Sequence, residues 1–147
     1  MAISFDEKQV RDMGRTAMGV RAIRLSEDDE VVAMEIVDPN KQLLVISEKG
    51  YGKRTKTTSY RLQTRGGKGV KTYKISDKTG YLVGAKSVHE DEEIIIINSD
   101  GSLIRMSVNQ ISILSRVTSG VKVMRTDETG SVVAFARIIV PEEELNI

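Results

Sequence analysis

Short apolar runs alternate with turn residues along the whole chain. Val, Ile, Leu and Thr gather in stretches such as residues 93–97 and 131–140, and Gly, Pro, Asn and Asp separate these stretches at roughly strand-length intervals. This pattern is typical of an all-β fold. We expect helix only in short turns at residues 8–13 and 108–111, where the apolar spacing briefly loosens.

A tight hairpin is predicted around Ser99-Asp100-Gly101. These residues separate two apolar runs, 94–97 and 103–106, and an Asp-Gly pair readily accepts the positive φ that such turns need. The run Ile94-Ile-Ile-Ile97 is expected to form a strand buried on both faces, because an exposed run of this kind would be an aggregation hazard.

The motif Arg-x-x-x-Gly-Val occurs three times at an even spacing. Its copies run from Arg15, Arg65 and Arg116, and their glycines stand 50 and then 51 residues apart. A fixed period in this range is typical of stacked or radially arranged units that cannot bury an apolar face alone. Roughly four to five strands in each unit would suit the blade of a propeller.

The period divides the chain into segments. We predict a partial blade at 1–37, full blades at 38–88 and 89–140, and a short acidic C-terminal tail at 141–147. An incomplete first blade leaves open strand edges. Residues 3–10 would either supply a missing edge strand or be exchanged with a second molecule in a strand-exchanged homodimer.

Composition limits the class of protein. The 147 residues are 39% hydrophobic and 29% charged, as in a globular domain with a real core. No apolar run approaches the length of a membrane span, and residues 1–8 do not resemble a secretory leader. Cysteine is absent, which excludes disulfides and thiolate metal sites. We therefore expect a cytoplasmic protein.

The charge is segregated although the net charge is only +1. Ten Lys and Arg residues lie between Lys41 and Ile75, against the single acid Glu48, and most acids cluster at 27–30, 90–93 and 142–144. Such segregation builds a positive surface, which attracts a polyanion. The alternative is that these charge runs are only solvated loops.

No catalytic arrangement is evident. His89 is the single histidine, with no second ligand nearby, so it is expected to be a surface residue and not to hold a metal. Gly66-Gly67-Lys68-Gly69 lacks the full spacing of a nucleotide-binding loop. We expect no cofactor, and the sequence favours a binding protein over an enzyme.

The segment Gln63-Thr-Arg-Gly-Gly-Lys-Gly69 resembles the gyrase-A box, Gln-Arg-Arg-Gly-Gly-Lys-Gly, of the C-terminal domain of DNA gyrase A. Six of seven positions match, and Thr64 stands where a basic residue is usual. Residues 13–25, 48–55 and 111–121 also look like blade segments of that type IIA topoisomerase domain. They resemble its later blades, which indicates its C-terminal half.

This resemblance implies a β-pinwheel, a propeller-like disc whose basic rim wraps duplex DNA. The implied partners are duplex DNA, the remainder of gyrase A, and gyrase B, which together introduce negative supercoils in an ATP-dependent reaction in the nucleoid. The family's active-site tyrosine lies in another part of gyrase A. Its Arg-Tyr setting is not found at any tyrosine here: Tyr51, Tyr60, Tyr73 or Tyr81.

Candidate DNA-binding residues follow from charge and from the resemblance. Lys and Arg neutralise phosphates, while glycines let backbone amides approach them. Arg15 and Arg116, which recur in the repeat, would form either rim contacts or ion pairs between blades. The predicted DNA-binding residues are Lys49, Lys53, Arg54, Lys56, Arg61, Gln63, Arg65, Gly66, Gly67, Lys68, Lys71, Arg105 and Arg116.

The low aromatic content, 4% with no Trp, favours duplex over single-stranded DNA, because few rings can stack on unpaired bases. No predicted helix would read bases in a groove, so weak sequence preference is expected. Two alternatives stay open. One is the related DNA-capture domain of topoisomerase IV, and the other is a fragment of a protein-interaction propeller.

Overall fold

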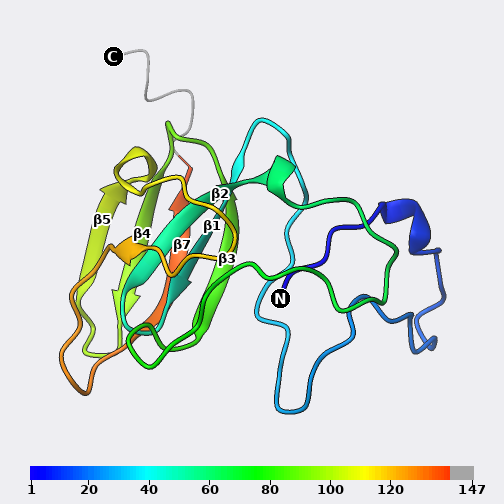
Figure 1. Cartoon of the computed structure of the whole chain (residues 1–147), viewed down its shortest axis with the longest axis horizontal. Coiled ribbons are helices and arrows are strands. Elements are labelled where there is room, and N and C mark those ends of the chain that lie inside the picture. The colour runs from blue at the N-terminus through cyan, green and yellow to red at the C-terminus, as the bar shows by residue number, and fades with distance from the viewer. Residues whose placement is uncertain (140–147) are drawn as a thin grey trace.

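Two antiparallel sheets dominate the computed structural model, which describes residues 1–139. Their strands are β1 (Gln42–Ser47), β2 (Tyr51–Lys56), β3 (Leu82–Val88), β4 (Glu93–Asn98), β5 (Leu103–Ser107), β6 (Val121–Lys122) and β7 (Val132–Ile138). One sheet has the order β3-β1-β2-β6 and the other the order β5-β4-β7. The prediction of an all-β chain is therefore confirmed, and the sheets lie side by side (Figure 1).

Each sheet is built on a hairpin between adjacent strands. β1 pairs with β2 across the turn that ends at Gly50, and β4 pairs with β5 across the turn at Gly101. The Gly101 amide donates to the Asn98 carbonyl at 3.0 Å, and its φ of 85° lies in the region that glycine favours. The hairpin predicted at Ser99-Asp100-Gly101 is confirmed.

The hydrophobic core lies where the two sheets meet. Alternate side chains of the strands point into it, as a period of two requires. A Cβ atom on Gly84 of β3 would lie 3.3 Å from Phe135 Cε1 of β7, so these strands approach closely. The core residues are Leu44, Ile46, Val88, Ile94, Ile96, Val108, Ile111, Met124, Val132 and Phe135.

β4 is covered less completely than its sequence suggested. Ile94 and Ile96 are fully buried, but Ile95 and Ile97 are only half-buried. The prediction of a strand buried on both faces is therefore wrong for the second face. One side of the sheet packs into the core, and the described residues cover the other side only in part.

The repeats are joined by the same contacts at two places. Ser4 bridges to Leu62, and at the corresponding place Arg54 bridges to Ile113, both in parallel orientation. Ala2 likewise pairs with Val70, as Gly52 pairs with Val121. Each repeat therefore adds an outer segment to the sheet of the repeat before it. The edge strand predicted at residues 3–10 is limited to bridges at residues 2 and 4.

Residues 31–37 correspond to β3 and β7 but form no strand. β3 is held by β1, and β7 by β4, whereas no strand within residues 1–139 pairs with residues 31–37. Met34 and Ile36 are consequently 91% and 88% exposed. Parts of residues 31–37, β3 and β7 line one shared cavity, so the three corresponding runs converge on one place.

Helical structure is limited to three short 3-10 turns in the described residues: η1 (Glu7–Gln9), η2 (Thr57–Ser59) and η3 (Val108–Gln110). Two lie near the predicted turns at 8–13 and 108–111, and η2 occupies the corresponding place in the second repeat. Across residues 1–139 no helix has the length and apolar character needed to span a membrane. The predicted tail at 141–147, and residue 140, lie outside the described residues.

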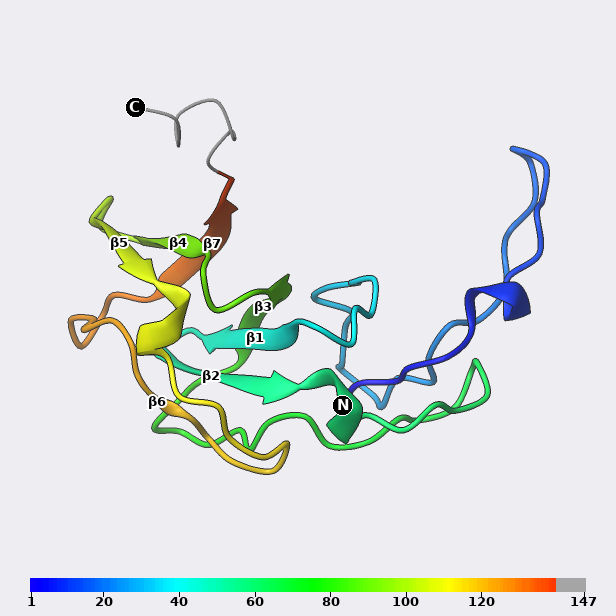
Figure 2. The same ribbon diagram turned by 90° about the horizontal axis from the view of Figure 1, so that it is seen from above.

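The first repeat leads away from the sheets. In Figure 2 the segment drawn in blue, near the N-terminus, extends to one end of the molecule, while β4, β5 and β7 lie at the other end. Its backbone returns to the second repeat at two hydrogen bonds, from the Gly66 amide to the Ala22 carbonyl and from the Arg24 amide to the Gly67 carbonyl, each 2.8 Å long.

Candidate nucleic-acid interface

The predicted DNA-binding residues fall into three classes of exposure. Six cationic side chains are exposed: Lys49, Lys56, Arg61, Lys68, Lys71 and Arg105. Five residues are half-buried: Gln63, Arg65, Gly66, Gly67 and Arg116. Lys53 and Arg54 are buried, with 0% and 5% of their surface exposed. The predicted site is therefore not one surface.

Lys53 holds two repeats together. Its Nζ donates to the carbonyl oxygens of Ser115 and Arg116, both at 2.6 Å, and lies 5.5 Å from the centroid of the Tyr73 ring. Burial, with the nearby Arg116 charge, lowers the pKa of Lys53 from 10.5 to about 8. The prediction that Lys53 binds phosphate is wrong, because its three donors face protein and no surface is left for a ligand.

Arg54 is occupied in the same way. Its Nε donates to the Ile111 carbonyl at 2.7 Å, and Nη1 donates to Gln42 Oε1 at 3.1 Å. Burial lowers the pKa of Arg54. The partners of Lys53 and Arg54 in the third repeat all lie within residues 111–118, so side chains that look exposed in a lone hairpin are covered by the next repeat. The prediction for Arg54 is also wrong.

The arginines of the repeat motif form hydrogen bonds between repeats. Arg116 Nη1 donates to the Lys71 carbonyl at 2.7 Å, and Arg65 Nη1 donates to the carbonyl of Arg21, the corresponding residue. Arg65 Nε also donates to the Gln9 carbonyl at 3.1 Å. Of the two roles predicted for Arg116, the contact is between blades, but its partner is a carbonyl and not a carboxylate.

The glycine-rich loop is shaped by packing. The Gly66 amide already donates to Ala22, so it is not free to approach a phosphate as predicted. Gly69 has a φ of 79°, and a Cβ atom there would lie under 3.0 Å from the Ala2 carbonyl oxygen. Gly120 stands in the same relation to Gly52. These glycines let one repeat lie on the backbone of the previous one, while Lys68 remains exposed.

A set of six exposed cations recurs at fixed positions after the motif. A Lys or Arg stands two residues after each motif glycine, and another stands five residues after it. The two residues between these cations are mostly buried or half-buried, as are Tyr73 and Met124. We call these six side chains the cation pairs: Arg21 and Arg24, Lys71 and Lys74, Lys122 and Arg125. Only Lys71 was among the predicted residues, although the spacing was visible in the sequence.

The second cation pair is joined to the loop that precedes the third pair. The Lys74 amide donates to the Thr118 carbonyl at 3.2 Å, and Ser119 Oγ donates to the Lys74 carbonyl at 2.9 Å. Lys122 then lies opposite Tyr51 in the β2–β6 pairing, with its Nζ 5.4 Å from the ring centroid. Lys78 Nζ lies 5.3 Å from the same ring. This cationic strip follows the outer segments of successive repeats.

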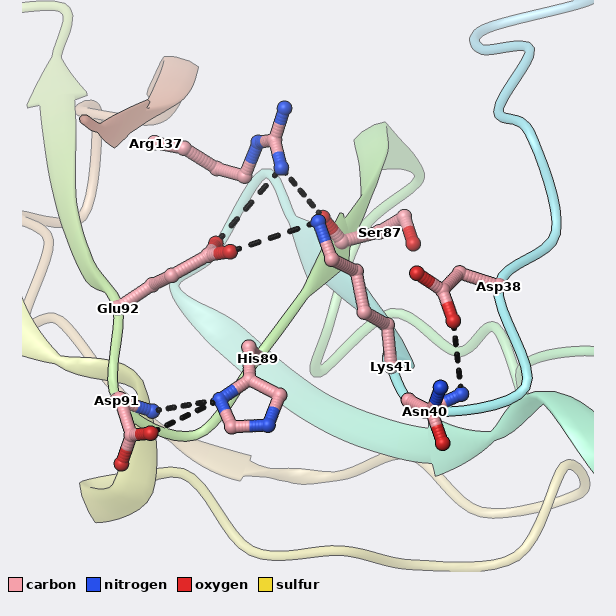
Figure 3. Close-up of polar contacts among 8 residues, drawn as sticks. All are labelled: Asp38, Asn40, Lys41, Ser87, His89, Asp91, Glu92 and Arg137. Atoms are coloured by element: carbon pink, nitrogen blue, oxygen red, sulfur yellow. Dashed lines mark hydrogen bonds and ion pairs between the residues drawn. The ribbon is translucent and has the colours of Figure 1, made fainter.

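The inner side of the sheets carries paired charges instead. Glu92 lies between Lys41 Nζ at 3.6 Å and Arg137 Nη1 at 3.8 Å, as Figure 3 shows. Arg137 also donates to the Ser87 carbonyl at 3.1 Å. These groups come from both sheets, so the cluster fixes one sheet against the other, and both cations are held by protein partners. Its two cations are therefore poor candidates for DNA contacts.

Two other polar features bear on function. His89 Nδ1 lies 3.2 Å from Asp91 Oδ2 in a surface turn (Figure 3), and residues 1–139 contain no group of three His, Cys, Asp or Glu side chains that could hold a metal. Arg105 Nε donates to Glu93 Oε2 at 2.7 Å, which partly neutralises this predicted DNA contact.

Known proteins share this fold and much of this sequence. Residues 1–38, 41–89 and 92–139 each match the family model described as DNA gyrase C-terminal domain, beta-propeller. The chain is 44% identical over 140 residues to the DNA gyrase A protein of Thermotoga maritima and 40% identical over 146 residues to that of Salmonella typhimurium. It covers 17% of each of these proteins, and they match 93% and 98% of it.

Solved structures agree. A DNA gyrase A C-terminal domain superposes with a TM-score of 0.85 at 33% identity, over 92% of this chain and 46% of that one. The C-terminal domain of DNA topoisomerase IV superposes with a TM-score of 0.84 at 24% identity, over 91% and 42%, and shows the shared fold alone. The resemblance seen at Gln63–Gly69 is confirmed, and so is the prediction of a partial set of pinwheel blades.

Proposed function

Since this chain belongs to the DNA gyrase C-terminal domain family, we propose that it binds duplex DNA without sequence specificity, through the strip formed by the cation pairs. The observation that carries the proposal is that all six cations are exposed at corresponding positions of three repeats. Regularly placed cations suit the regularly spaced phosphates of a duplex and give affinity without base readout.

The difference between cations that contact protein groups and cations that are exposed supports this proposal. Lys53, Arg54, Arg65 and Arg116 are engaged with protein carbonyls, and Lys41 and Arg137 are both paired with Glu92. The cation pairs lie on outer segments instead. Lys56, Arg61 and Lys68, the other exposed predicted residues without a carboxylate partner in the described structure, extend the same proposal. Lys49 is exposed too, but its Nζ donates to the Asp77 carbonyl, so it is a weaker candidate.

We also propose that the strip wraps DNA and that the chain acts within a larger assembly. A strip that follows the outside of successive blades would bend a bound duplex with one hand. The relatives are gyrase A proteins of which this chain spans about 17%, so the rest of gyrase A, together with gyrase B, are the proposed partners in ATP-dependent negative supercoiling. The cytoplasm, at the nucleoid, is the proposed location.

DNA cleavage is not proposed for these residues. The Tyr60 hydroxyl is bonded to Thr72 Oγ1 and the Tyr73 hydroxyl donates to the Ser119 carbonyl. Burial raises the pKa of both phenols, which opposes formation of the phenolate nucleophile. The blade division at 1–37, 38–88 and 89–140 remains our proposal for the units that carry the strip.

The test is a duplex-binding titration. Replacing Lys71, Lys74, Lys122 and Arg125 with Gln should weaken binding to a linear duplex by at least about tenfold. Lys86→Gln is the matched control, because Lys86 lies on β3, at the edge of the sheet opposite to the Lys122 strand β6. Equal affinity of the four-site variant and the parent chain would refute the proposed interface.

Wrapping is separated from simple binding by topology. Nicked circles ligated in the presence of the chain should retain writhe of one hand if the duplex is wrapped. Circles that relax to the same distribution as naked DNA, despite saturation, would leave duplex binding in place and exclude wrapping. That second result would favour the capture role described for topoisomerase IV.

A further inference from the structure

The turn between β1 and β2 holds two other segments of the chain in place. The Lys49 amide donates to the Thr79 carbonyl at 3.0 Å, which ties the turn before β3 to this one. From the third repeat, the Val123 amide donates to the Gly50 carbonyl at 2.8 Å. Three segments that lie far apart in the sequence therefore meet at this turn.

Two ammonium groups from those segments lie over the ring of Tyr51, the first residue of β2. Lys78 Nζ is 5.3 Å from the ring centroid and Lys122 Nζ is 5.4 Å from it. Because both distances end at the same ring, the two ammonium groups can be no farther apart than their sum. The electron-rich face of the ring attracts each cation, so Tyr51 holds two like charges near each other that would otherwise repel.

The hydrogen-bond donors of these two lysines face solvent. Lys78 and Lys122 are exposed, and within residues 1–139 the lysine Nζ groups that donate to protein groups belong to other residues. Lys53 shows the contrast. It also lies over a ring, that of Tyr73, but it is buried and donates to carbonyls. The same kind of contact is enclosed at Tyr73 and leaves two cations accessible at Tyr51.

Two acids in the same turns do not neutralise these lysines. Glu48 Oε2 accepts from the Tyr81 amide at 3.0 Å, and the Asp77 carbonyl accepts from Lys49 Nζ. The ion pairs formed within residues 1–139 involve neither of these acids and neither of the two lysines. Both ammonium groups are therefore available to an anion from outside the chain.

This arrangement is not part of the repeat. In the third repeat Ser102 stands at the place of Tyr51, and in the shared Asp-x-Thr-Gly turn Glu128 stands at the place of Lys78. Lys122, in contrast, has a counterpart in Lys71. The ring and its second cation are thus particular to the junction between the second and third repeats, in addition to the strip formed by the cation pairs.

We propose that Lys78 and Lys122 form a clamp for backbone phosphates of the duplex, and that Tyr51 positions both lysines. This inference rests on the proposed duplex binding and adds to it a contact, Lys78, that lies outside the basic stretch at 41–75 and outside the cation pairs. Lysine carries its charge on a flexible four-carbon stem. The ring orders two such stems before binding, so less conformational freedom is lost when the ammonium groups reach phosphates.

A duplex titration of Lys78→Gln gives the first test. At about 0.1 M salt the variant should bind about threefold or more weakly, and the slope of log affinity against log salt should lose about 1 in magnitude. Lys86→Gln, which removes the same charge on the opposite edge of the sheet, should change neither quantity.

Failure of this inference is distinguishable from failure of the proposed function. If replacing Lys71, Lys74, Lys122 and Arg125 weakens duplex binding but Lys78→Gln changes neither the affinity nor the slope, the clamp is refuted and the proposed interface stands. If the parent chain does not bind a duplex at all, both are refuted.

The positioning role of Tyr51 is tested by two variants that keep both lysines. Tyr51→Phe keeps the face of the ring and should bind the duplex as the parent chain does. Tyr51→Leu removes the ring and should bind about threefold more weakly, with the circular dichroism of the parent chain. Equal duplex affinities of the Phe and Leu variants would overturn the positioning role, even if their thermal stabilities differ.

A double-mutant cycle separates positioning from a structural effect of the ring. Lys78→Gln should weaken duplex binding less in the Tyr51→Leu chain than in the parent chain, because Lys78 is no longer held there. Fluorescence anisotropy of a labelled duplex measures all four affinities. Equal losses in the two backgrounds would show that the ring does not act through Lys78 and would refute its positioning role.

Discussion

Lys53 Nζ lies 2.6 Å from the carbonyl oxygen of Ser115, across the boundary between the second and third repeats. The ammonium group is enclosed, and backbone carbonyls replace the water that would otherwise solvate it. A cation in the middle of the most basic stretch of the sequence therefore joins two blades and does not face a ligand. The surrounding lysines differ from it in exposure, not in charge.

This enclosure predicts a pH dependence of stability. The pKa of Lys53 is lowered to about 8, so between about pH 8 and 10.5 the unfolded chain binds more protons than the folded one. The free energy of unfolding should therefore rise with pH across this window. Urea unfolding at several pH values from about 7 to 9 measures it, because the pKa values of Tyr60 and Tyr73 are raised in the folded chain and unfolded tyrosines, with a pKa of about 10, stay largely protonated in this range.

The control for this effect is Lys53→Met, which cannot titrate. Its unfolding free energy should lack the rise that the parent chain shows, whatever its absolute value at neutral pH. Parallel pH profiles in the two proteins would show that Lys53 is not the group responsible.

Gly120 should tolerate a side chain much less well than Gly101. Both have positive φ, 75° and 85°, so alanine strains the backbone at either place. At Gly120 the new Cβ would also collide with the Gly52 carbonyl, whereas at Gly101 nothing lies within 4 Å. Gly120→Ala should cost about 1–3 kcal/mol more than Gly101→Ala in denaturant unfolding. Similar losses at the two sites would mean that the repeats are not in the described contact.

Arg116 and Arg125 should separate the structural from the DNA-binding cations. Arg116→Ala removes the hydrogen bond to the Lys71 carbonyl and should lower stability by about 1 kcal/mol. Arg125 is exposed, so Arg125→Ala should leave stability nearly unchanged but weaken duplex binding. Thermal unfolding and a duplex titration of both variants measure this. The reverse pattern would place Arg116 on the DNA and Arg125 in the junction.

The repeat made the fold predictable. A fixed 50–51 residue spacing of the Gly-Val pairs, with Asp100-Gly101 at a turn, indicated blades and one hairpin directly. The burial of Lys53 and Arg54 could not be predicted in this way. β2 reads as a polar strand within its own repeat, and the groups that enclose these two side chains come from residues 111–118 of the next repeat.

The cation pairs, in contrast, could have been predicted from the sequence. Each lies two and five residues after a motif glycine, as Lys71 and Lys74 follow Gly69. Local charge density drew attention to residues 41–75 instead, yet density does not distinguish an enclosed lysine from an exposed one. Residues 31–37 carried a similar ambiguity, because their apolar run matches β3 while no described strand pairs with them.

The salt dependence of the duplex affinity should show how many of the cation pairs contact phosphates. If all six cations contact phosphates, the slope of log affinity against log salt should be about −5, since each neutralised phosphate contributes about −0.9. Replacing Lys122 and Arg125 with Gln should reduce the magnitude of that slope by about 2, and replacing Lys71 and Lys74 as well should reduce it by about 2 again. Lys86→Gln, on the opposite edge of the sheet, should leave the slope unchanged.

Fluorescence anisotropy of a labelled duplex at several salt concentrations provides the slopes. If the two replacements lower the magnitude of the slope by equal amounts, the two repeats make equivalent phosphate contacts, as their corresponding positions predict. If the slope stays constant through both replacements, the cation pairs do not contact the DNA.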